Sequence, residues 1–475
     1  MASSHLAKRL VVDSIHGDIH LSAQEWNVVN TGSFQRLRKI KQLGMGHFTY
    51  PNATHTRFAH SLGVLGIMAR VLKAIEGSPL PLNREDRNNL RLAALLHDIG
   101  HYPYSHVMET VDSVKLTEEA IDEPGAAKKS LNLTTSRYPS HEELGKLIVT
   151  NQQELIDAIG GASRARAVAD LFTRSQAANP QLSKLIHSSL DMDRLDYLLR
   201  DSRAAGVPYG IIDINYILNN VKVSKSGMLG VSRKALPAAE QFLMARHFMH
   251  RAVYYHKTTV ALEEACRQML RRLRDRVGKN YGVPKNGGQV KDWVTSGRIG
   301  SFADGFIDGV VQSALSDRDA VIGALAACIH RRRPPRLLKE VCALEASSGS
   351  SAAVTAFKVN FRRGIKDLAK KHSMAAGRFL FWEAKPVKFE ERGPTVTAHQ
   401  ARSLASEQEE EAIKVFMEAG GEPNSIMDIE HSVMRLCASH VFCIVRLYFV
   451  DAGVDPEPDL LKKLRSEVQD WDRAS

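Results

Sequence analysis

Apolar residues recur at helical spacing along most of the chain between Ala23 and about Leu273. Apolar positions at i, i+3, i+4 and i+7 are typical of helices that bury one face against a core. The segments that show this pattern most clearly are FQRLRKIKQL (34–43), LGVLGIMARVLKAI (62–75), LRLAALLHDIG (90–100) and HEELGKLIVT (141–150). The pattern therefore predicts a mainly α fold for this part of the chain.

Two segments of the helical part have a different pattern. Residues 9–22 contain two short apolar runs around His16-Gly17-Asp18, which predict a small β-hairpin. Residues 116–140 are long and polar, and we expect them to form a mobile loop or lid.

The pattern changes again toward the C-terminus. The segment 378–398 has the composition of strands, whereas 407–416 and 457–471 have the pattern of helices. We therefore divide the chain into a helical body, residues 1–330, and a smaller mixed α/β region, residues 331–475.

Charge and cysteine content narrow the class of protein. The chain has 64 Lys and Arg against 53 Asp and Glu, a net charge of +11, which favours a polyanionic partner such as a nucleotide or a nucleic acid. The five cysteines form no CxxC pair, which is typical of free thiols in a reducing compartment. We find neither a secretory signal core nor an apolar run long enough to span a membrane, so we expect a cytoplasmic protein.

His97-Asp98 is the first candidate for chemistry, because it follows an apolar helical run. A buried imidazole beside a buried carboxylate needs partners, and a divalent metal ion can satisfy both. One such dipeptide is weak evidence, since it often occurs by chance. His101 would share a helix face with His97 if the helix continued, and Asp193 lies in a second helical segment, SLDMDRLDYLLRDS (189–202). A cation is the simplest explanation of this set.

The pattern H…HD…D, formed by His60, His97-Asp98 and Asp193, resembles the HD-domain metal-dependent phosphohydrolases. Its flanks narrow the resemblance to the dNTP triphosphohydrolases, which include the animal SAM-and-HD-domain enzyme and bacterial dGTPase-like proteins. The flanks are FQRLRKIKQLG, YPNATHTRFAHSLGV, HDIGHYPYSH, HEE, DMDRLDYLLRD and RHFMHRAVYYHK. The resemblance runs from about residue 9 to 275 and implies an HD-domain helical bundle without a SAM domain.

The resemblance implies hydrolysis of a dNTP to a deoxynucleoside and triphosphate in the body. For residues 331–475, which the resemblance does not cover, we expect an oligomerisation or regulatory role. The implied metal ligands are His60, His97, Asp98 and Asp193. Their mixed nitrogen and oxygen donors leave Mn, Fe, Mg, Zn, Ni and Co open. The implied catalytic residues are His141, Glu109, His101 and His106. Glu109 stands in place of an Asp, and a structural role for His106 is an equal alternative.

A third set of residues is implied to bind the substrate. Arg57, Arg194, Arg246 and Lys257 would hold the phosphates, and Gln42, Leu43, Tyr197, Asp201 and Tyr254 would surround the sugar. His250 is implied to bind the substrate from the same helix as Arg246. The spacing of Arg246, His250, Tyr254 and Lys257 predicts one helical stripe. The plainer alternatives are a solvated basic face for the cations and core packing for Tyr254.

The resemblance also implies regulation and assembly. Arg9, Asn30, Gln35, Arg38 and His256 match positions of an activator-nucleotide site, and Asn30 replaces a carboxylate that would read guanine. We expect a homo-oligomer, a dimer or a tetramer, that is favoured by nucleotide; a constitutive dimer is the alternative. Two other functions stay open: hydrolysis of a ribonucleotide or an alarmone, and nucleic-acid binding or nuclease activity, for which we find no motif.

Overall fold

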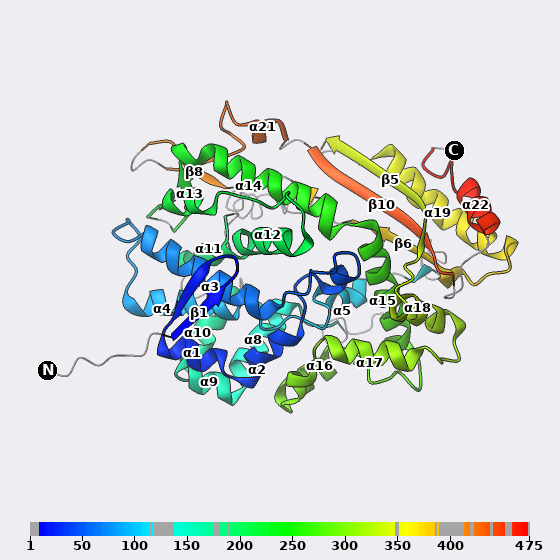
Figure 1. The fold of residues 1–475 in the computed structure, drawn as a ribbon, viewed down its shortest axis with the longest axis horizontal. Helices are drawn as coiled ribbons and strands as arrows, with labels where there is room; N and C mark the ends of the chain where they lie inside the picture. Colours follow the sequence, from blue (N-terminus) through cyan, green and yellow to red (C-terminus); the bar gives the residue numbers. More distant parts are fainter. Residues whose placement is uncertain are drawn as a thin grey trace, which may run out of the picture.

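A computed structural model gives the fold of the chain (Figure 1). It describes residues 9–113, 116–117, 137–173, 180–187, 190–225, 227–346, 351–384, 387–388, 413–418, 422–437, 440–451 and 458–473. Packed helices form most of the molecule, a hairpin lies near the N-terminus, and a sheet lies on the side of the C-terminus. The expected fold class, mainly α with a smaller mixed region, is confirmed.

The helices of the body are listed here with their bounds. The first half contains α1 (Ala23–Val29), α2 (Gly32–Gln35), α3 (Arg57–Ala74), α4 (Arg84–Leu96), α5 (His106–Glu109), α8 (His141–Asn151), α9 (Gln153–Ile159), α10 (Ala162–Phe172), α11 (Pro180–Ile186) and α12 (Met192–Ala205). The second half contains α13 (Ile214–Asn219), α14 (Leu236–Met249), α15 (Lys257–Asp275), α16 (Gly287–Thr295), α17 (Asp304–Ala314) and α18 (Ala320–His330). Among the described residues, no helix combines the length and apolar character needed to cross a membrane.

The expected N-terminal hairpin is present as β1 (Arg9–Asp13) and β2 (Gly17–Leu21), paired antiparallel. Its turn is closed by the Asp13 carboxylate, which accepts hydrogen bonds from the backbone N–H of Ile15 and His16, each at 2.9 Å. Gly17 ends the turn with φ +71°, a conformation that costs little without a Cβ. The turn therefore has a defined shape, and it projects the His16 side chain to one side.

Helices α3, α4 and α12 form the centre of the body; α3 carries His60, α12 carries Asp193, and His97-Asp98 follows the end of α4. Helix α4 begins with a capping box between Asn83 and Asp86, and it ends at Leu96. The helix expected over 90–100 therefore stops before its His-Asp pair, because His97 is already the C-cap. The helix expected over 34–43 is also interrupted: α2 gives way to a 3-10 turn, Arg36–Lys39, and Ile40 is extended.

Helices α14 and α15 are separated by a π-helical turn, His250–Tyr254. The turn ends at Tyr255, and His256 then caps α15 by accepting a hydrogen bond from the N–H of Thr258. A continuous helix would have put Arg246, His250, Tyr254 and Lys257 in one stripe. The break before Lys257 separates this last residue from the other three.

A mostly antiparallel sheet forms the C-terminal region, with strand order β5 (Arg336–Ala346), β10 (His440–Phe449) and β6 (Phe379–Glu383), and with β7 (Val387–Lys388) also paired to β10. Helices α19 (Ala352–Lys371) and α22 (Pro458–Glu467) lie beside it (Figure 1). Phe357, Phe361 and Leu464 join apolar residues of the strands in a second core. Strands expected in 378–398 and a helix expected in 457–471 are thus confirmed for the described residues.

One expected helix is wrong where the structure describes it. Within 407–416, residues Lys414–Phe416 form β8, which pairs in parallel with β4 (Leu229–Ser232) of the body and antiparallel with β9 (Asn424–Ser425). Val415 is buried against Val231, so tertiary pairing outweighs the helical pattern of the acidic run before it. β4 also pairs with β3 (Val221–Val223), and α21 (Val433–Cys437) precedes β10.

Two expectations fall largely outside the described residues. Residues 118–136 of the expected lid and residues 389–412 are not described, so neither expectation is tested there. The division at residue 330 stays a prediction: α18 ends at His330 and the sheet begins at Arg336, yet β8 returns to the body.

Candidate active site

A cavity of about 520 Å³ lies among α3, α4, α12, the π turn and α15. Its walls carry several histidines, carboxylates and arginines, together with Tyr197 and Tyr254. A cavity of this size holds a small molecule. The concentration of titratable side chains in one cavity marks it as the candidate active site.

His97, Asp98 and Asp193 line one side of the cavity, and His60 adjoins the two carboxylates; these are the four residues expected to bind a metal ion. His60 Nε2 lies 2.9 Å from Asp193 Oδ1 and 3.5 Å from Asp98 Oδ2. His97 Nε2 lies 3.3 Å from Asp98 Oδ1 and 3.7 Å from Asp193 Oδ1. Two imidazoles and two carboxylates, contributed by α3, the end of α4, and α12, therefore share a space a few ångströms wide.

Both imidazoles of this cluster are held in orientation by a hydrogen bond at Nδ1, the ring nitrogen that does not face the carboxylates of the cluster. His60 donates its Nδ1–H to Asp196 Oδ2 at 2.7 Å, and His97 donates its Nδ1–H to the Ala94 carbonyl at 2.8 Å. Their Nε2 atoms are buried in the cluster, and neither makes a hydrogen bond. Such orphaned nitrogens beside carboxylate oxygens fit a divalent cation, as does the mixed donor set.

The electrostatics of the cluster also favour a positive charge. Burial alone would lower the pKa of His60, but Asp193, Asp196 and Asp98 outweigh it and raise that pKa to about 10. Burial would raise the pKa of Asp98, whereas the charge of Arg57 and the nearby histidines hold it well below its usual value. The carboxylates are therefore ionised, and the space between them attracts cations.

A second cluster lies beside the first and contains the four expected catalytic residues. Glu109 accepts hydrogen bonds from His141 Nδ1 at 2.9 Å and from His106 Nδ1 at 2.8 Å. The ring of His101 stacks on that of His141 with centroids 4.3 Å apart. His101 Nε2 lies 3.0 Å from Asp98 Oδ1, so Asp98 joins the two clusters.

The histidines of the second cluster differ in their affinity for a proton. Burial would lower the pKa of His141, but the hydrogen bond and charge of Glu109 outweigh it, so the pKa is raised. For His101, burial and the charge of Arg57 lower the pKa well below its usual value. The surroundings therefore favour the protonated form of His141 and the neutral form of His101.

Close packing of α8 brings His141 into this cluster. A Cβ at Gly100, two residues past Asp98, would overlap the carbonyl oxygen of His141 and the backbone nitrogen of Gly145. Glycine at this position lets the first turn of α8 approach the HD segment closely. The glycine therefore belongs to the geometry of the site, although it carries no functional group.

The expected phosphate ligands are placed differently from one another. Arg57 is buried, and its Nη1 donates to Asp98 Oδ2 at 2.7 Å, so its charge is already shared with a carboxylate. Arg194, Arg246 and His250 line the cavity. Lys257 does not: it is exposed and lies in a separate groove with Arg336 and Arg465.

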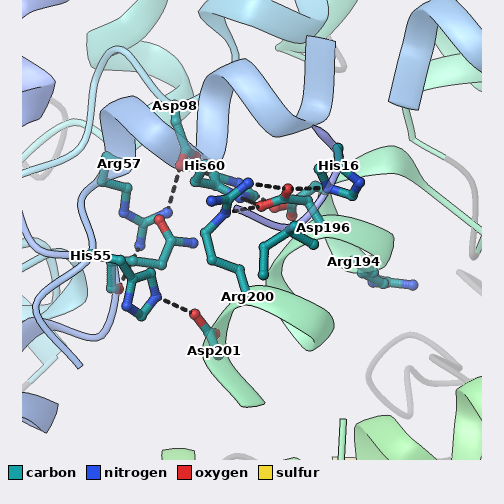
Figure 2. A network of polar contacts seen from close by, with 12 residues as sticks. His16, His55, Arg57, His60, Asp98, Arg194, Asp196, Arg200 and Asp201 are labelled. Carbon is teal, nitrogen blue, oxygen red and sulfur yellow. Dashed lines mark hydrogen bonds and ion pairs between the residues drawn. The ribbon is translucent and has the colours of Figure 1, made fainter. Parts of the chain in front are cut away.

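The residues expected to surround a sugar lie together. Tyr254 donates its hydroxyl to Asp201 Oδ2 at 3.0 Å, and its ring meets that of Tyr197 edge to face, with centroids 6.0 Å apart. His55 Nε2 lies 2.6 Å from Asp201 Oδ1 (Figure 2), so both oxygens of Asp201 are engaged. Gln42, next to Leu43 in the cavity wall, has a buried Oε1 without a hydrogen-bond partner, which leaves one acceptor for a ligand.

The residues expected at an activator site lie outside the cavity. Asn30 caps α1 and donates to the Trp26 carbonyl, and Gln35 accepts from Arg38 Nε at 2.7 Å. Arg9 lies on β1, and His256 caps α15. Their role in activation stays a prediction.

Four residues behind the site were missed by reading the sequence: His16, His55, Asp196 and Arg200. Figure 2 shows three of them around His60, with the side chains of His16 and Arg200 meeting that of Asp196. The i, i+4 spacing of Asp196 and Arg200 was a usable signal for an ion pair on α12. Nothing in the sequence showed that a hairpin about 180 residues away would join them.

Comparison with known families matches this region of the chain. A family model described as HD domain matches residues 57–201, and one described as HD associated region matches residues 212–281. The first range contains both clusters described above. The hairpin that carries His16 lies outside both ranges.

Curated relatives cover part of the chain. An uncharacterised protein of Methanocaldococcus jannaschii is 33% identical over 53% of this chain and 46% of its own length. The deoxynucleoside triphosphate triphosphohydrolase SAMHD1 homolog of Dictyostelium discoideum is 28% identical over 55% of this chain and 48% of its own length. This chain spans about half the length of these relatives.

Solved structures share the fold over almost the whole chain. A phosphohydrolase from Bacteroides thetaiotaomicron has a TM-score of 0.66 at 21% identity, covering 93% of this chain and 99% of that one. A hypothetical protein from Aquifex aeolicus has a TM-score of 0.67 at 21% identity, covering 97% and 100%. At this identity the likeness establishes the fold alone.

Proposed function

This chain carries an HD domain followed by an HD-associated region, and on that premise we propose that it is a metal-dependent dNTP triphosphohydrolase. One observation carries the proposal: a single cavity joins a His/Asp cluster suited to a divalent cation, a Glu109–His141 pair suited to proton transfer, and arginines suited to phosphates. The SAMHD1 relatives favour a dNTP as the substrate.

The proposed reaction breaks the bond between the α-phosphorus and the 5′ oxygen of the nucleotide. Water gives a hydroxyl group to phosphorus and a proton to the medium, and the departing 5′ oxygen takes up one proton. A divalent ion held by His60, His97, Asp98 and Asp193 would act as a Lewis acid toward phosphate oxygens. Arg194 and Arg246 add positive charge in the same cavity, which stabilises the negative charge that builds up on the phosphates.

His141 is the residue best placed to supply the proton for the leaving oxygen. Glu109 holds its Nδ1–H at 2.9 Å, which fixes the ring and stabilises the imidazolium form. The opposite nitrogen, Nε2, is then the one that can deliver a proton. Glu109 thereby plays an orienting and charge-stabilising role rather than that of the proton donor.

The sugar end of the cavity supports deoxynucleotides over ribonucleotides. Tyr254 is fixed by Asp201 on one side and Tyr197 on the other, so its ring is a rigid wall. A rigid aromatic wall beside the 2′ carbon leaves a 2′ hydroxyl neither room nor a partner, which disfavours its binding. The unpaired Oε1 of Gln42 is available to accept from a sugar hydroxyl.

The test is a panel of dNTPs and NTPs incubated with Mn²⁺ or Mg²⁺, with detection of inorganic triphosphate. We expect triphosphate and deoxynucleoside from dNTPs, and much slower release from NTPs. Products with a shorter phosphate chain, or equal rates with NTPs or an alarmone, would contradict the assignment. Salt-dependent DNA binding without triphosphate release would point instead to a nucleic-acid-binding protein.

We also propose a homo-oligomer whose larger form is favoured by nucleotide. Arg9 and Lys257 lie outside the catalytic cavity. The separate groove that contains Lys257, Arg336 and Arg465 is rich in positive charge, which suits a polyanion that bridges two subunits. Sedimentation of the His141→Ala protein, with and without dNTP, tests this. A monomer under both conditions contradicts the oligomer, and a mass that nucleotide does not change contradicts the activator site.

A further inference from the structure

We propose that the turn of the N-terminal hairpin is part of the metal centre, with Asp13 and His16 acting as positioning residues for the ligand His60 through Asp196 and Arg200. The inference rests on the metal site of the proposed function. It goes beyond that site because the hairpin lies outside the matched HD range, and His16 and Asp13 bond Asp196 and Arg200 rather than a proposed ligand.

Asp196 is the centre of this network, and all of its acceptor positions are used. Its Oδ2 accepts from His60 Nδ1 at 2.7 Å and from Arg200 Nε at 2.8 Å. Its Oδ1 accepts from His16 Nε2 at 2.6 Å and from Arg200 Nη2 at 2.8 Å. The carboxylate is fully buried, so its direction is set by these three side chains rather than by water.

The hairpin holds the other end of Arg200. Asp13 accepts from Arg200 Nη1 at 2.9 Å and from Nη2 at 3.1 Å, so the guanidinium bridges two carboxylates. A bidentate arginine has little freedom to rotate, which is why it fixes both partners. Asp13 is itself fixed by the N–H groups of the turn, so the turn, Arg200 and Asp196 form one rigid unit.

Gly63 shows how closely this unit approaches the helix that carries His60. It lies one turn after His60 on α3, and a Cβ there would overlap Asp196 Oδ1 and Arg200 Nη2. The Asp196–Arg200 pair therefore sits against the backbone of α3 beside the metal ligand. A small shift of the pair would move the acceptor of His60 Nδ1–H directly.

The consequence for the metal centre follows from the geometry of imidazole. The bond from Nδ1–H to Asp196 fixes both the tautomer and the ring plane of His60, and so the direction of Nε2. Loss of such a bond behind a metal-binding histidine typically weakens metal affinity about 10- to 100-fold. His16 and Asp13 act one bond further out, so we expect about 10-fold for each.

The experiment compares His16→Ala, His16→Gln and His20→Gln. Each protein is loaded with Mn²⁺ and titrated with a chelator, and the retained Mn²⁺ is measured by mass spectrometry, together with the melting temperature of the metal-free protein. His16→Ala should release Mn²⁺ at about 10-fold lower chelator concentration. His16→Gln, whose amide can still donate to Asp196, should recover most of the affinity. His20 is exposed on the same hairpin, so His20→Gln is the matched control and should behave as wild type.

A second pair keeps the test decisive if His16→Ala does not fold. Asp13→Asn removes the charge that holds Arg200, and Asp18→Asn is its control, an exposed Asp on the same hairpin. Wild-type Mn²⁺ retention in both His16→Ala and Asp13→Asn would overturn the proposal. So would equal Mn²⁺ loss in His16→Ala and His16→Gln, because that would indicate general destabilisation.

The proposed function can fail separately. If wild type retains Mn²⁺, loses it on His16→Ala and yet releases no triphosphate from dNTPs, the positioning role stands and the substrate assignment is wrong. If wild type retains no Mn²⁺, both are overturned.

Discussion

The two histidine clusters of the cavity use the same residue types in opposite proportions. The first places His60 and His97 among carboxylates, and both imidazoles direct an unpaired Nε2 into the space between them. The second places one carboxylate, Glu109, among imidazoles that donate their Nδ1–H to it. An excess of carboxylate oxygens around two imidazoles suits a cation, whereas an excess of imidazoles around one carboxylate suits proton transfer.

Burial alone does not distinguish these environments. The cavity is also lined by Glu263, which forms an ion pair with Arg267 at 3.8 Å. Burial raises the pKa of Glu263 to about 7, with the charge of Arg267 offsetting only part of that effect. Burial acts in the same direction on Glu109, yet hydrogen bonds from His106 and His141 hold its pKa far below the usual value. The partners therefore decide the protonation state.

The largest effect should come from the first cluster. Replacing His97 and Asp98 together by Ala removes two proposed ligands, so we expect loss of bound metal and of all detectable hydrolysis. Metal analysis and the triphosphate assay check this. If the variant keeps one equivalent of metal, the cation belongs to the second cluster, and the contrast between the clusters is wrong.

The second cluster should give a smaller effect of a different kind. His141→Ala should lower turnover by about 10²- to 10⁴-fold, the usual scale for a positioned acid or base, while bound metal stays at the wild-type level. Rate measurements at saturating dNTP and metal analysis of the same sample check both parts. Metal loss in this variant would show that the two clusters are not functionally separate.

A third variant tests the connection behind the first cluster. Gly63→Ala should displace Asp196 and Arg200, lowering Mn²⁺ affinity about 10- to 100-fold and reducing stability. Gly309→Ala is the matched control, because this helical glycine on α17 has open space around its would-be Cβ. That control should gain up to about 1 kcal/mol of stability. Unchanged metal affinity in Gly63→Ala would mean that α3 absorbs the added methyl group without moving His60.

The four proposed ligands were identified through the resemblance of H…HD…D and its flanks to a known family, because those motifs are local in the sequence. Periodicity placed only the helices around them: an apolar helical run precedes His97-Asp98, and Asp193 shares a helix face with Asp201. It failed where structure depends on distant partners. Strand β8 forms because Val415 pairs with Val231 of β4. The helical stripe expected to reach Lys257 is interrupted by a π turn, which the spacing of apolar residues does not predict. His16 is another such case, since its partner lies on α12.

The smallest predicted effect concerns Glu263, the carboxylate paired with Arg267. Because burial raises the folded-state pKa of Glu263 from its ordinary value of 4.5 to about 7, the folded protein binds more protons than the unfolded chain between these two pH values. Stability contributed by Glu263 is therefore fully present below about pH 4.5 and is lost as the pH rises through 7. Glu263→Gln removes this titration. The free energy of unfolding of Glu263→Gln minus that of wild type should therefore be about 1–3 kcal/mol larger at pH 8 than at pH 5. Chemical denaturation at the two pH values measures this difference.

Glu154→Gln is a control of opposite sign. Hydrogen bonds from Gly32 and Ser33 outweigh burial and lower the pKa of Glu154, so its ionised form stabilises the fold. A pH-independent difference between Glu263→Gln and wild type would show that Glu263 has a partner as effective as the imidazoles of Glu109.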